Sequence, residues 1–185
     1  GGAGPLMALD SFRFSVTVPG QTIGVPLPNG LVGHWRFDEG SGTVAADASG
    51  FGHDGTVVNA SWVPGADANA LAFNGSSSSV VLPATTFDSV NEEISIAMWV
   101  YGDPLQPLND SVLYAVDGSG NRVLNIHLPY GNSNVYWDAG YSGGYDRINK
   151  VATPAEIQGS WAHWVFTKNA ATGNMRIYRN GVLWH

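Results

Sequence analysis

The chain has 185 residues, a length that suits one domain, and 44% of them are hydrophobic, which is enough for a sizeable core. The net charge is -7 and the eight Lys and Arg residues are scattered, which excludes the basic patch of a protein that binds nucleic acid or an anionic membrane. The lack of cysteine excludes disulfides and thiolate metal sites, and no apolar run approaches the ~18 residues that span a bilayer, so we expect no membrane insertion.

The chain is expected to begin with a leader that contains one strand. Residues 1–10 are predicted to be flexible, and the alternating apolar residues of SFRFSVTV predict a strand over residues 11–18. The stretch that follows is rich in Pro and Gly and is predicted to be a linker, because proline cannot donate to a sheet. We therefore divide the chain into a leader over residues 1–30 and a main domain over residues 31–185.

The main domain is predicted to consist of strands joined by glycine turns. In ISIAMWVYG, residues 94–102, apolar residues occupy alternate positions, and Asn180-Gly181 is a strong signal for a type I′ hairpin. The other predicted strands are LVGHWRF, LAFNG, SVVLP, SVLYAV, RVLNIHL, NVYWDAG, WAHWVFTKN and NMRIYRNGVLW. Residues 153–159 are the one helical candidate. This pattern predicts an all-β fold, an antiparallel two-sheet jelly-roll β-sandwich with an extra N-terminal strand.

Four blocks of the sequence carry a resemblance to a known family. LVGHWRFDEGSGTVAADASGFGHDGTVVN and ALAFNGSSSSVVLP come first, and ISIAMWVYG and GSWAHWVFTKNAATGNMRIYRNGVLW follow. In this order they resemble the opening strand, the next hairpin, a central strand and the late hairpin of concanavalin A-like jelly-roll domains of laminin-G type. The resemblance implies a concanavalin A-like sandwich from about Leu31 onward. The family's pattern continues past the late hairpin, so we expect either that further strands lie beyond His185 or on another chain, or that the leader strand SFRFSVTV covers the open edge.

The resemblance does not choose one function. Domains of this family serve as glycan-binding lectins, adhesion modules, appendages of carbohydrate-active enzymes and structural parts of surface and viral proteins. Enzymes that share the sandwich carry carboxylates in an E-x-D-x-x-E run, which places acid and nucleophile on one face of a strand. No such run occurs here, and the adjacent pairs Asp38-Glu39 and Glu92-Glu93 would point to opposite faces. We therefore expect a protein without enzymatic activity.

A structural calcium ion is one hypothesis for the glycine-rich stretch near residue 50. Asp47 and Asp54 resemble the two acids of the family's D-x-S-G-N-x-x-D-G loop, where calcium can bind, although Phe51 replaces the Asn. The alternative is an Asx-turn in which backbone N–H groups satisfy the carboxylates without metal. The family's acidic loop after the F-x-G hairpin is replaced by four serines, residues 76–79, which removes the carboxylates that a second calcium site would use.

The region from His127 to Ile148 is the candidate ligand-binding region, because it combines aromatic rings with fixed polar groups, as sugar recognition requires. The candidate residues are Tyr130, Asn132, Tyr136, Trp137, Asp138, Tyr141, Tyr145, Asp146 and Arg147. The alternative is that Tyr136 and Trp137 straddle a strand with one ring in the core, and that the tyrosines cover loops. His127 and His163 are expected to be buried, hydrogen-bonded residues rather than ligands.

Three hypotheses for the function follow. The first is a non-catalytic extracellular recognition or adhesion module that binds a glycan or surface polysaccharide through loops at one edge of the sandwich. The second is a structural subunit of a surface filament or virion, in which the leader strand and open edges pair with neighbouring chains. The third is an accessory module of a carbohydrate-active enzyme. All three imply a location outside the cell, on the cell surface or on the virion surface.

Overall fold

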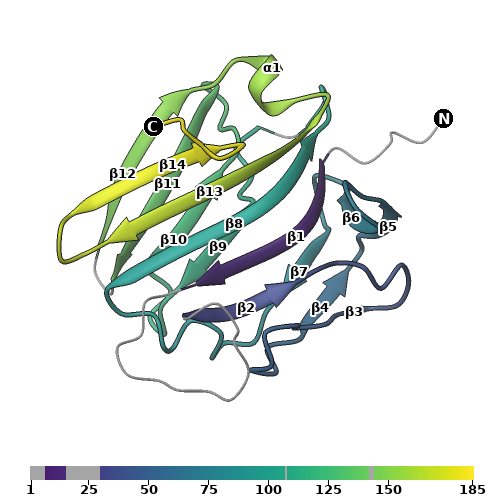
Figure 1. Ribbon diagram of the computed structural model, residues 1–185, viewed down its shortest axis with the longest axis horizontal. Coiled ribbons are helices and arrows are strands. Elements are labelled where there is room, and N and C mark those ends of the chain that lie inside the picture. The colour runs from purple at the N-terminus through teal and green to yellow at the C-terminus, as the bar shows by residue number, and fades with distance from the viewer. Residues whose placement is uncertain (1–6, 16–29, 107, 142–143) are drawn as a thin grey trace.

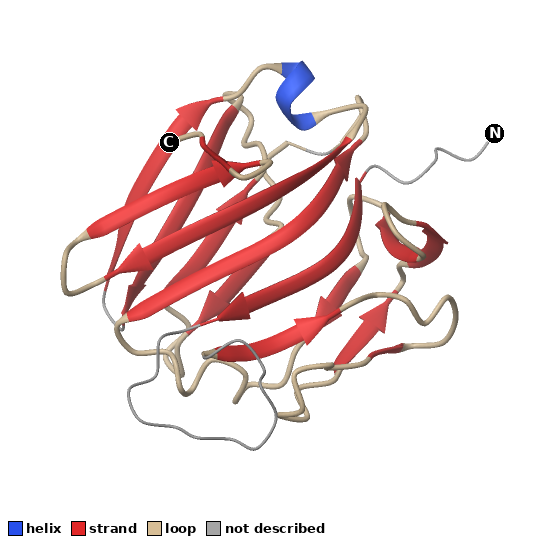
Figure 2. Cartoon of the chain, in the orientation of Figure 1, coloured by secondary structure: helices blue, strands red, loops and turns tan. Residues whose placement is uncertain are grey.

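The computed structural model describes residues 7–15, 30–106, 108–141 and 144–185. Within this part of the chain almost all regular structure is β-strand, and the one helix, α1 (Pro154–Ile157), lies at one end of the molecule (Figure 2). In these residues no helix is long and apolar enough to cross a membrane. The prediction of an all-β fold is therefore confirmed.

One layer of the sandwich is an eight-stranded antiparallel sheet. Its order is β15-β14-β13-β8-β1-β6-β5, and β2 also pairs with β1. The strands are β1 (Met7–Ser15), β2 (Leu31–Trp35), β5 (Ser61–Pro64), β6 (Asn69–Phe73), β8 (Glu93–Gly102), β13 (Trp161–Asn169), β14 (Asn174–Arg179) and β15 (Val182–Leu183). The turn between β14 and β15 is the predicted type I′ hairpin, because Asn180 and Gly181 both have positive φ, at 50° and 79°.

The second layer consists of two smaller sheets. A four-stranded sheet has the order β12-β11-β10-β9, and a three-stranded sheet has the order β3-β4-β7. These strands are β3 (Val44–Ala45), β4 (Gly55–Val58), β7 (Ser79–Val81), β9 (Leu113–Val116), β10 (Arg122–His127), β11 (Asn134–Tyr141) and β12 (Gly144–Val151). In Figure 1 the strands β9 to β12 lie behind β8, β13 and β14.

The core lies between the layers and follows the predicted period of two. In β8 the alternate residues Ile94, Ile96, Met98 and Val100 are buried, as the alternation in ISIAMWVYG predicts. The largest buried side chains are Trp35, Trp137, Trp164 and Phe166. The Trp164 and Phe166 rings stack with 6.3 Å between their centroids, and Trp137 contacts Phe166 from the opposite sheet at 6.0 Å. Aromatic packing of this kind makes the two sheets one unit.

The position and the start of the N-terminal strand correct two expectations. The strand begins at Met7, inside the stretch predicted to be flexible, and ends at Ser15, while residues 16–18 of the predicted strand lie outside the described residues. It covers no open edge, because it pairs with β8 on one side and with β2 and β6 on the other. The sheet register explains why the strand starts at Met7, because this residue pairs with Gly102 of β8 and with Phe73 of β6. The division of the chain at residue 30 stays a prediction.

Four strands were not predicted, and one of them changes the account of the ligand-binding region. β3, β4 and β5 have two to four residues each, which is too short for a clear alternation. The sequence predicts a loop in this ligand-binding region, whereas the structure has the strand β12, with the sequence GYDRINKV, in which six of the eight residues are exposed. The predicted helix over residues 153–159 shortens to Pro154–Ile157, with the carboxylate of Glu156 accepting the N–H of Thr153 at 2.7 Å.

Candidate functional site on the four-stranded sheet

The pleat of β11 divides the predicted ligand-binding residues between two faces. Val135, Trp137 and Ala139 point into the core, and Tyr136 and Asp138 point to the outer face of the four-stranded sheet. The hairpin partner β12 continues this outer face, because its register places Arg147 opposite Asp138. Seven of the nine candidate residues therefore lie on β11 and β12, and only Tyr130 and Asn132 lie in a loop, between β10 and β11, which corrects the expectation that the site is built from loops at an edge.

Asp138 organises the outer face. Its carboxylate is 0% exposed and accepts two bonds from Arg147, from Nε at 2.6 Å and from Nη2 at 2.7 Å. Nη1 of Arg122 donates to the same carboxylate at 3.1 Å, and Nδ2 of Asn125 lies at 3.4 Å. The bidentate pair with Asp138 raises the pKa of Arg147 above its ordinary value, although partial burial opposes this. Two guanidinium groups are therefore held in fixed positions by one buried carboxylate.

Tyrosine rings surround these two guanidinium groups. Arg147 lies over the rings of Tyr136 and Tyr145, at 4.7 Å and 5.3 Å from the ring centroids. Arg122 lies over Tyr145 and Tyr114, at 5.5 Å and 5.7 Å. Tyr114 and Tyr145 are 55% and 41% exposed, so both rings remain accessible to a ligand. We call this surface the tyrosine–arginine face; it consists of Tyr114, Arg122, Tyr136, Asp138, Tyr145 and Arg147.

The charges of this face differ from those of the chain as a whole. It contains two guanidinium groups and one carboxylate, and these sum to a charge of about +1 on a chain whose net charge is -7. Guanidinium groups donate in fixed directions, and aromatic rings offer flat apolar faces. The arrangement can therefore bind a ligand that combines hydrogen-bond acceptors with an apolar face.

A second group of rings adjoins the tyrosine–arginine face at Tyr136. Tyr130 meets Tyr136 edge-on with 5.7 Å between centroids, and Asn132 Nδ2 donates to the Tyr136 hydroxyl at 2.8 Å. His127 contacts both rings, at 4.8 Å and 6.0 Å between centroids, and is buried, and its Nδ1 lies 2.8 Å from the carbonyl oxygen of Asp110. The predicted role of His127 as a buried, hydrogen-bonded residue is confirmed. His163 is partly buried against Trp99, with 5.3 Å between the rings.

Two of the nine predicted ligand-binding residues, Trp137 and Asp146, point away from this surface, and a third, Tyr141, is not placed. Trp137 is 0% exposed and donates from Nε1 to the carbonyl of Thr167 in the opposite sheet, so its proposed role in stacking on a sugar is wrong. Asp146 points to the other side of β12, where its carboxylate lies 2.7 Å from Nζ of Lys168. The side chain of Tyr141 lies outside what the structure describes.

The structure adds three residues that the sequence did not indicate. Tyr114 comes from β9, and Arg122 and Asn125 come from β10. In the sheet register Asn125 lies opposite Tyr114 on one side and opposite Asp138 on the other, so β9 and β10 bring these side chains to the site. The only available sequence signal was the alternation in SVLYAV, which separates Tyr114 from the core residues Leu113 and Ala115.

The proposed calcium loop, residues 47–54, is closed by hydrogen bonds. Oδ1 of Asp47 accepts the N–H groups of His34 and Ser49 at 3.0 Å and 2.9 Å, and Oδ2 accepts the Ser49 hydroxyl and the His53 N–H at 2.7 Å and 3.0 Å. Oδ1 of Asp54 accepts the N–H of Asp47 at 2.8 Å. This is the Asx-turn that the sequence left open as the alternative to calcium.

The same hydrogen bonds determine the acidity of Asp47. Burial raises its pKa, but the bonds from Ser49, His34 and His53 outweigh burial and hold the pKa below the ordinary value of 3.8. In the described part of the chain no three His, Cys, Asp or Glu side chains are grouped so that they could hold a metal ion. The geometry favours the Asx-turn, and calcium at this loop stays a proposal.

Comparison with known families identifies the superfamily of this chain. A family model described as the concanavalin A-like lectin/glucanases superfamily matches residues 74–185, which include the central strand, the tyrosine–arginine face and the late hairpin. The first block of the resemblance precedes residue 74 and stays a prediction. No curated protein and no solved structure gives a significant match. The family model covers more than half of the chain, and the chain therefore belongs to the concanavalin A-like lectin/glucanases superfamily.

Proposed function

We propose that this protein is a non-catalytic, extracellular recognition or adhesion module that binds a glycan or surface polysaccharide at the tyrosine–arginine face. Membership of the superfamily supports a carbohydrate-binding or structural module in general terms. The observation that supports the specific proposal is the pair of exposed rings, Tyr114 and Tyr145, beside guanidinium groups held in place by a buried carboxylate.

This geometry suits a sugar for two reasons. A sugar ring presents C–H groups on one face, which stack on tyrosine, and hydroxyls at its rim, which accept bonds from guanidinium groups. Because Arg147 is already fixed by two bonds to Asp138 and by the Tyr136 ring, little side-chain freedom is lost when a ligand binds. The face therefore resembles a surface that is organised before the ligand arrives.

The ion pairs of Asp138, the carboxylate of this face, support the proposal of a non-catalytic role. Glycoside hydrolysis requires two carboxyl groups that flank the scissile bond. The tyrosine–arginine face contains one carboxylate, Asp138, which is buried and committed to Arg122 and Arg147. Asp146 follows on the neighbouring strand but points to the opposite side of the sheet, toward Lys168.

A glycan array tests the proposal. The wild type and the Tyr145→Ala variant would be probed together with Trp99→Ala, a matched control whose exposed ring (38%) lies on the eight-stranded sheet. We expect wild type and Trp99→Ala to bind the same glycans and Tyr145→Ala to bind them about tenfold more weakly, which is about 1.4 kcal/mol for one stacked ring. Absence of binding by the wild type, or equal binding by Tyr145→Ala, would contradict the proposal.

A structural role is the second candidate, because an apolar edge strand is exposed. β15 ends the eight-stranded sheet, and its two residues, Val182 and Leu183, are both exposed. An exposed apolar edge can pair with a strand of a neighbouring chain. Sedimentation of the wild type and of Val182→Lys over a range of concentrations tests this role. We expect association that the lysine variant loses, and a wild type that stays monomeric would contradict it.

A further inference from the structure

A cleft lies between two strand edges of the second layer. Among the described residues, β7 pairs only with β4 and ends the three-stranded sheet, and β9 pairs only with β10 and ends the four-stranded sheet. The cleft has a volume of about 290 Å³, and its walls come from β7 with the serine loop before it, residues 74–78, and from residues 110–113. The N–H and C=O groups on the free side of an edge strand can bond to another strand. The cleft therefore offers two such edges to a guest.

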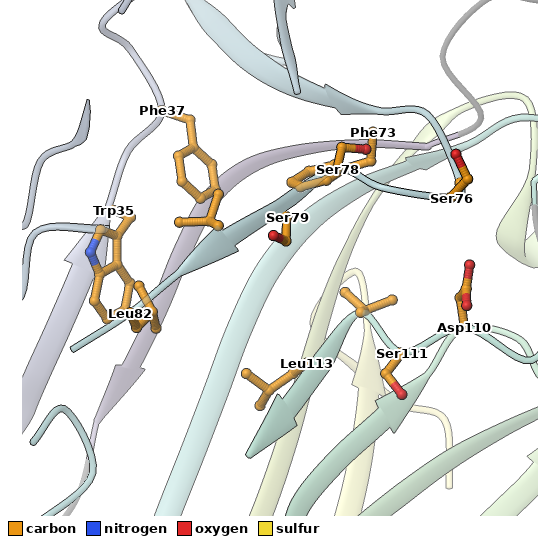
Figure 3. A pocket seen from close by; sticks show the side chains of 13 residues that line it. Trp35, Phe37, Phe73, Ser76, Ser78, Ser79, Leu82, Asp110, Ser111 and Leu113 are labelled. Atoms are coloured by element: carbon orange, nitrogen blue, oxygen red, sulfur yellow. The ribbon is translucent and has the colours of Figure 1, made fainter. Parts of the chain in front are cut away.

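The two edges run in the same direction, which suits one guest strand. β6 and β8 are both antiparallel to β1, so they run the same way, and β7 follows β6 in the chain as β9 follows β8. In Figure 3 the strands that contain Ser79 and Leu113 run in one direction on opposite sides of the cleft. A guest strand of the opposite direction would therefore be antiparallel to both, which is the pairing that β7 already has with β4 and β9 with β10.

The walls of the cleft leave apolar side chains incompletely buried. Trp35 and Phe37, at the end beside β2, are 0% and 3% exposed, so a guest does not reach them. Other hydrophobic side chains of the walls pack against the core but stay partly exposed; they are Phe73, Val80, Leu82, Val112 and Leu113. Successive residues of a strand point to opposite faces, so every second side chain of a guest would cover this surface. The cleft therefore fits a strand with apolar residues at alternate positions.

The polar end of the cleft adds a charge requirement. Ser76 and Asp110 are exposed and lie opposite each other at this end (Figure 3). The backbone carbonyl of Asp110 lies 2.8 Å from Nδ1 of His127, but within the described part of the chain no donor is bonded to its carboxylate. Because β7 and β9 both start at this end, the C-terminal residue of an antiparallel guest would lie beside Asp110. A Lys or Arg at that position would pair with the carboxylate.

We propose that this cleft binds an extended segment of another protein as an added strand, antiparallel to β7 and β9. The segment has apolar residues at alternate positions and a Lys or Arg at its C-terminal end. A partner of different sequence suits the cleft better than a second copy of this chain, because two copies with a net charge of -7 repel each other. None of the six residues of the tyrosine–arginine face lines the cleft, so the two sites are separate.

Two capped pentapeptides test the pairing and its direction. The probe is TVTVK, which has both valines on one face and lysine at its C-terminal end, and the control is the reversed sequence KVTVT; both are acetylated and amidated. Each is titrated into the wild type while backbone amide chemical shifts are recorded. We expect TVTVK to shift the amides of β7 and β9 and to bind about two- to fivefold more tightly than KVTVT, because only its lysine meets Asp110. Equal affinities, or shifts that avoid both strands, would overturn the proposal.

Two variants test the role of Asp110. Asp110→Asn keeps the shape of the side chain and removes its charge, and Asp88→Asn is a matched control at an exposed residue that does not line the cleft. We expect Asp110→Asn to bind the two peptides equally and Asp88→Asn to keep the preference for TVTVK. A preference for TVTVK that survives in Asp110→Asn would contradict the direction assigned to the guest strand and would overturn the proposal.

A methylated peptide separates strand pairing from side-chain contact. TVTVK with N-methyl groups on both valines keeps its side chains and its charge but loses two N–H donors that point to the same edge. We expect it to bind at least about tenfold more weakly, because two hydrogen bonds are lost, and unchanged affinity would overturn the proposal. Amide shifts of β7 and β9 that change on dilution without peptide would assign the cleft to a second copy of this chain, which would also overturn it.

The outcome is separable from that of the proposed function. Tyr145→Ala is expected to weaken binding to the array glycans and to leave the affinity for TVTVK unchanged, and Asp110→Asn is expected to leave array binding unchanged. Failure of the cleft proposal alone appears as array binding that depends on Tyr145 without any preference between the two peptides. A loss of peptide affinity in folded Tyr145→Ala would place the peptide on the tyrosine–arginine face and would overturn the cleft proposal.

Discussion

Replacing Asp138 by Asn tests whether this carboxylate organises the outer face of the four-stranded sheet. The substitution keeps the shape of the side chain but removes the charge, and it places an amide donor against the donors of Arg147 and Arg122. Breaking a fully buried ion pair typically costs 3–5 kcal/mol. Both arginines are partly exposed, at 37% and 31%, and can turn toward water, so we expect a loss of about 2–3 kcal/mol.

The measurement is urea unfolding followed by tryptophan fluorescence, which Trp137 in the same strand reports from the core. Because a chain of this size loses about 2–4 °C of midpoint per kcal/mol, thermal unfolding should shift down by about 5–10 °C. Asp146→Asn is the control, since Asp146 is 72% exposed and Lys168 keeps its hydrogen bond to the Ala139 carbonyl when the pair is lost, so we expect a cost of about 1 kcal/mol. The reasoning would be refuted if Asp138→Asn destabilised the protein no more than Asp146→Asn does.

Four further predictions follow from the fold and the Asp47 loop. Trp137→Phe should lower the free energy of unfolding by about 1–3 kcal/mol without changing glycan affinity, and a loss of affinity in a folded variant would return Trp137 to the binding site. Because the pKa of Asp47 is lowered in the folded state, its carboxylate stabilises the fold above pH 3.8, and this stabilisation is lost as the pH falls through the lower folded pKa. Asp47→Asn should therefore be less stable than wild type at pH 7 and equally stable in strong acid. A difference in unfolding free energy that grows in acid would contradict this. Melting of the wild type with and without EGTA tests calcium, and an unchanged midpoint would remove calcium from the account. Deleting residues 1–15 should unfold or strongly destabilise the chain, because β1 pairs along both edges, and an unchanged melting temperature would show that β1 is dispensable.

The fold could be predicted because its evidence is local. The apolar alternation of ISIAMWVYG determines which residues of β8 are buried, and Asn180-Gly181 determines a hairpin, whatever lies elsewhere in the chain. The position of β1 could not be predicted in this way. Its place between β8 and β2 depends on pairing with strands that lie far along the sequence, and alternation within one strand contains no information about its partners.

The candidate site could be predicted in part for the same reason. Composition alone indicated Tyr136, Asp138, Tyr145 and Arg147, because aromatic and charged residues are concentrated there. Sheet register then decided which of them meet: Asp138 and Arg147 are opposite each other, whereas the neighbouring Trp137 points into the core. Arg122 reaches the site from another strand and could not have been found without that register.

The most direct test of the central claim is to map where a bound glycan contacts the protein. Backbone amide chemical shifts would be recorded while the strongest glycan from the array is titrated into the wild type. We predict that the largest shifts fall on β9, β11 and β12, around Tyr114, Asp138 and Tyr145. Shifts confined to the eight-stranded sheet around Trp99, or to the Asp47 loop, with β11 and β12 unchanged, would contradict the account.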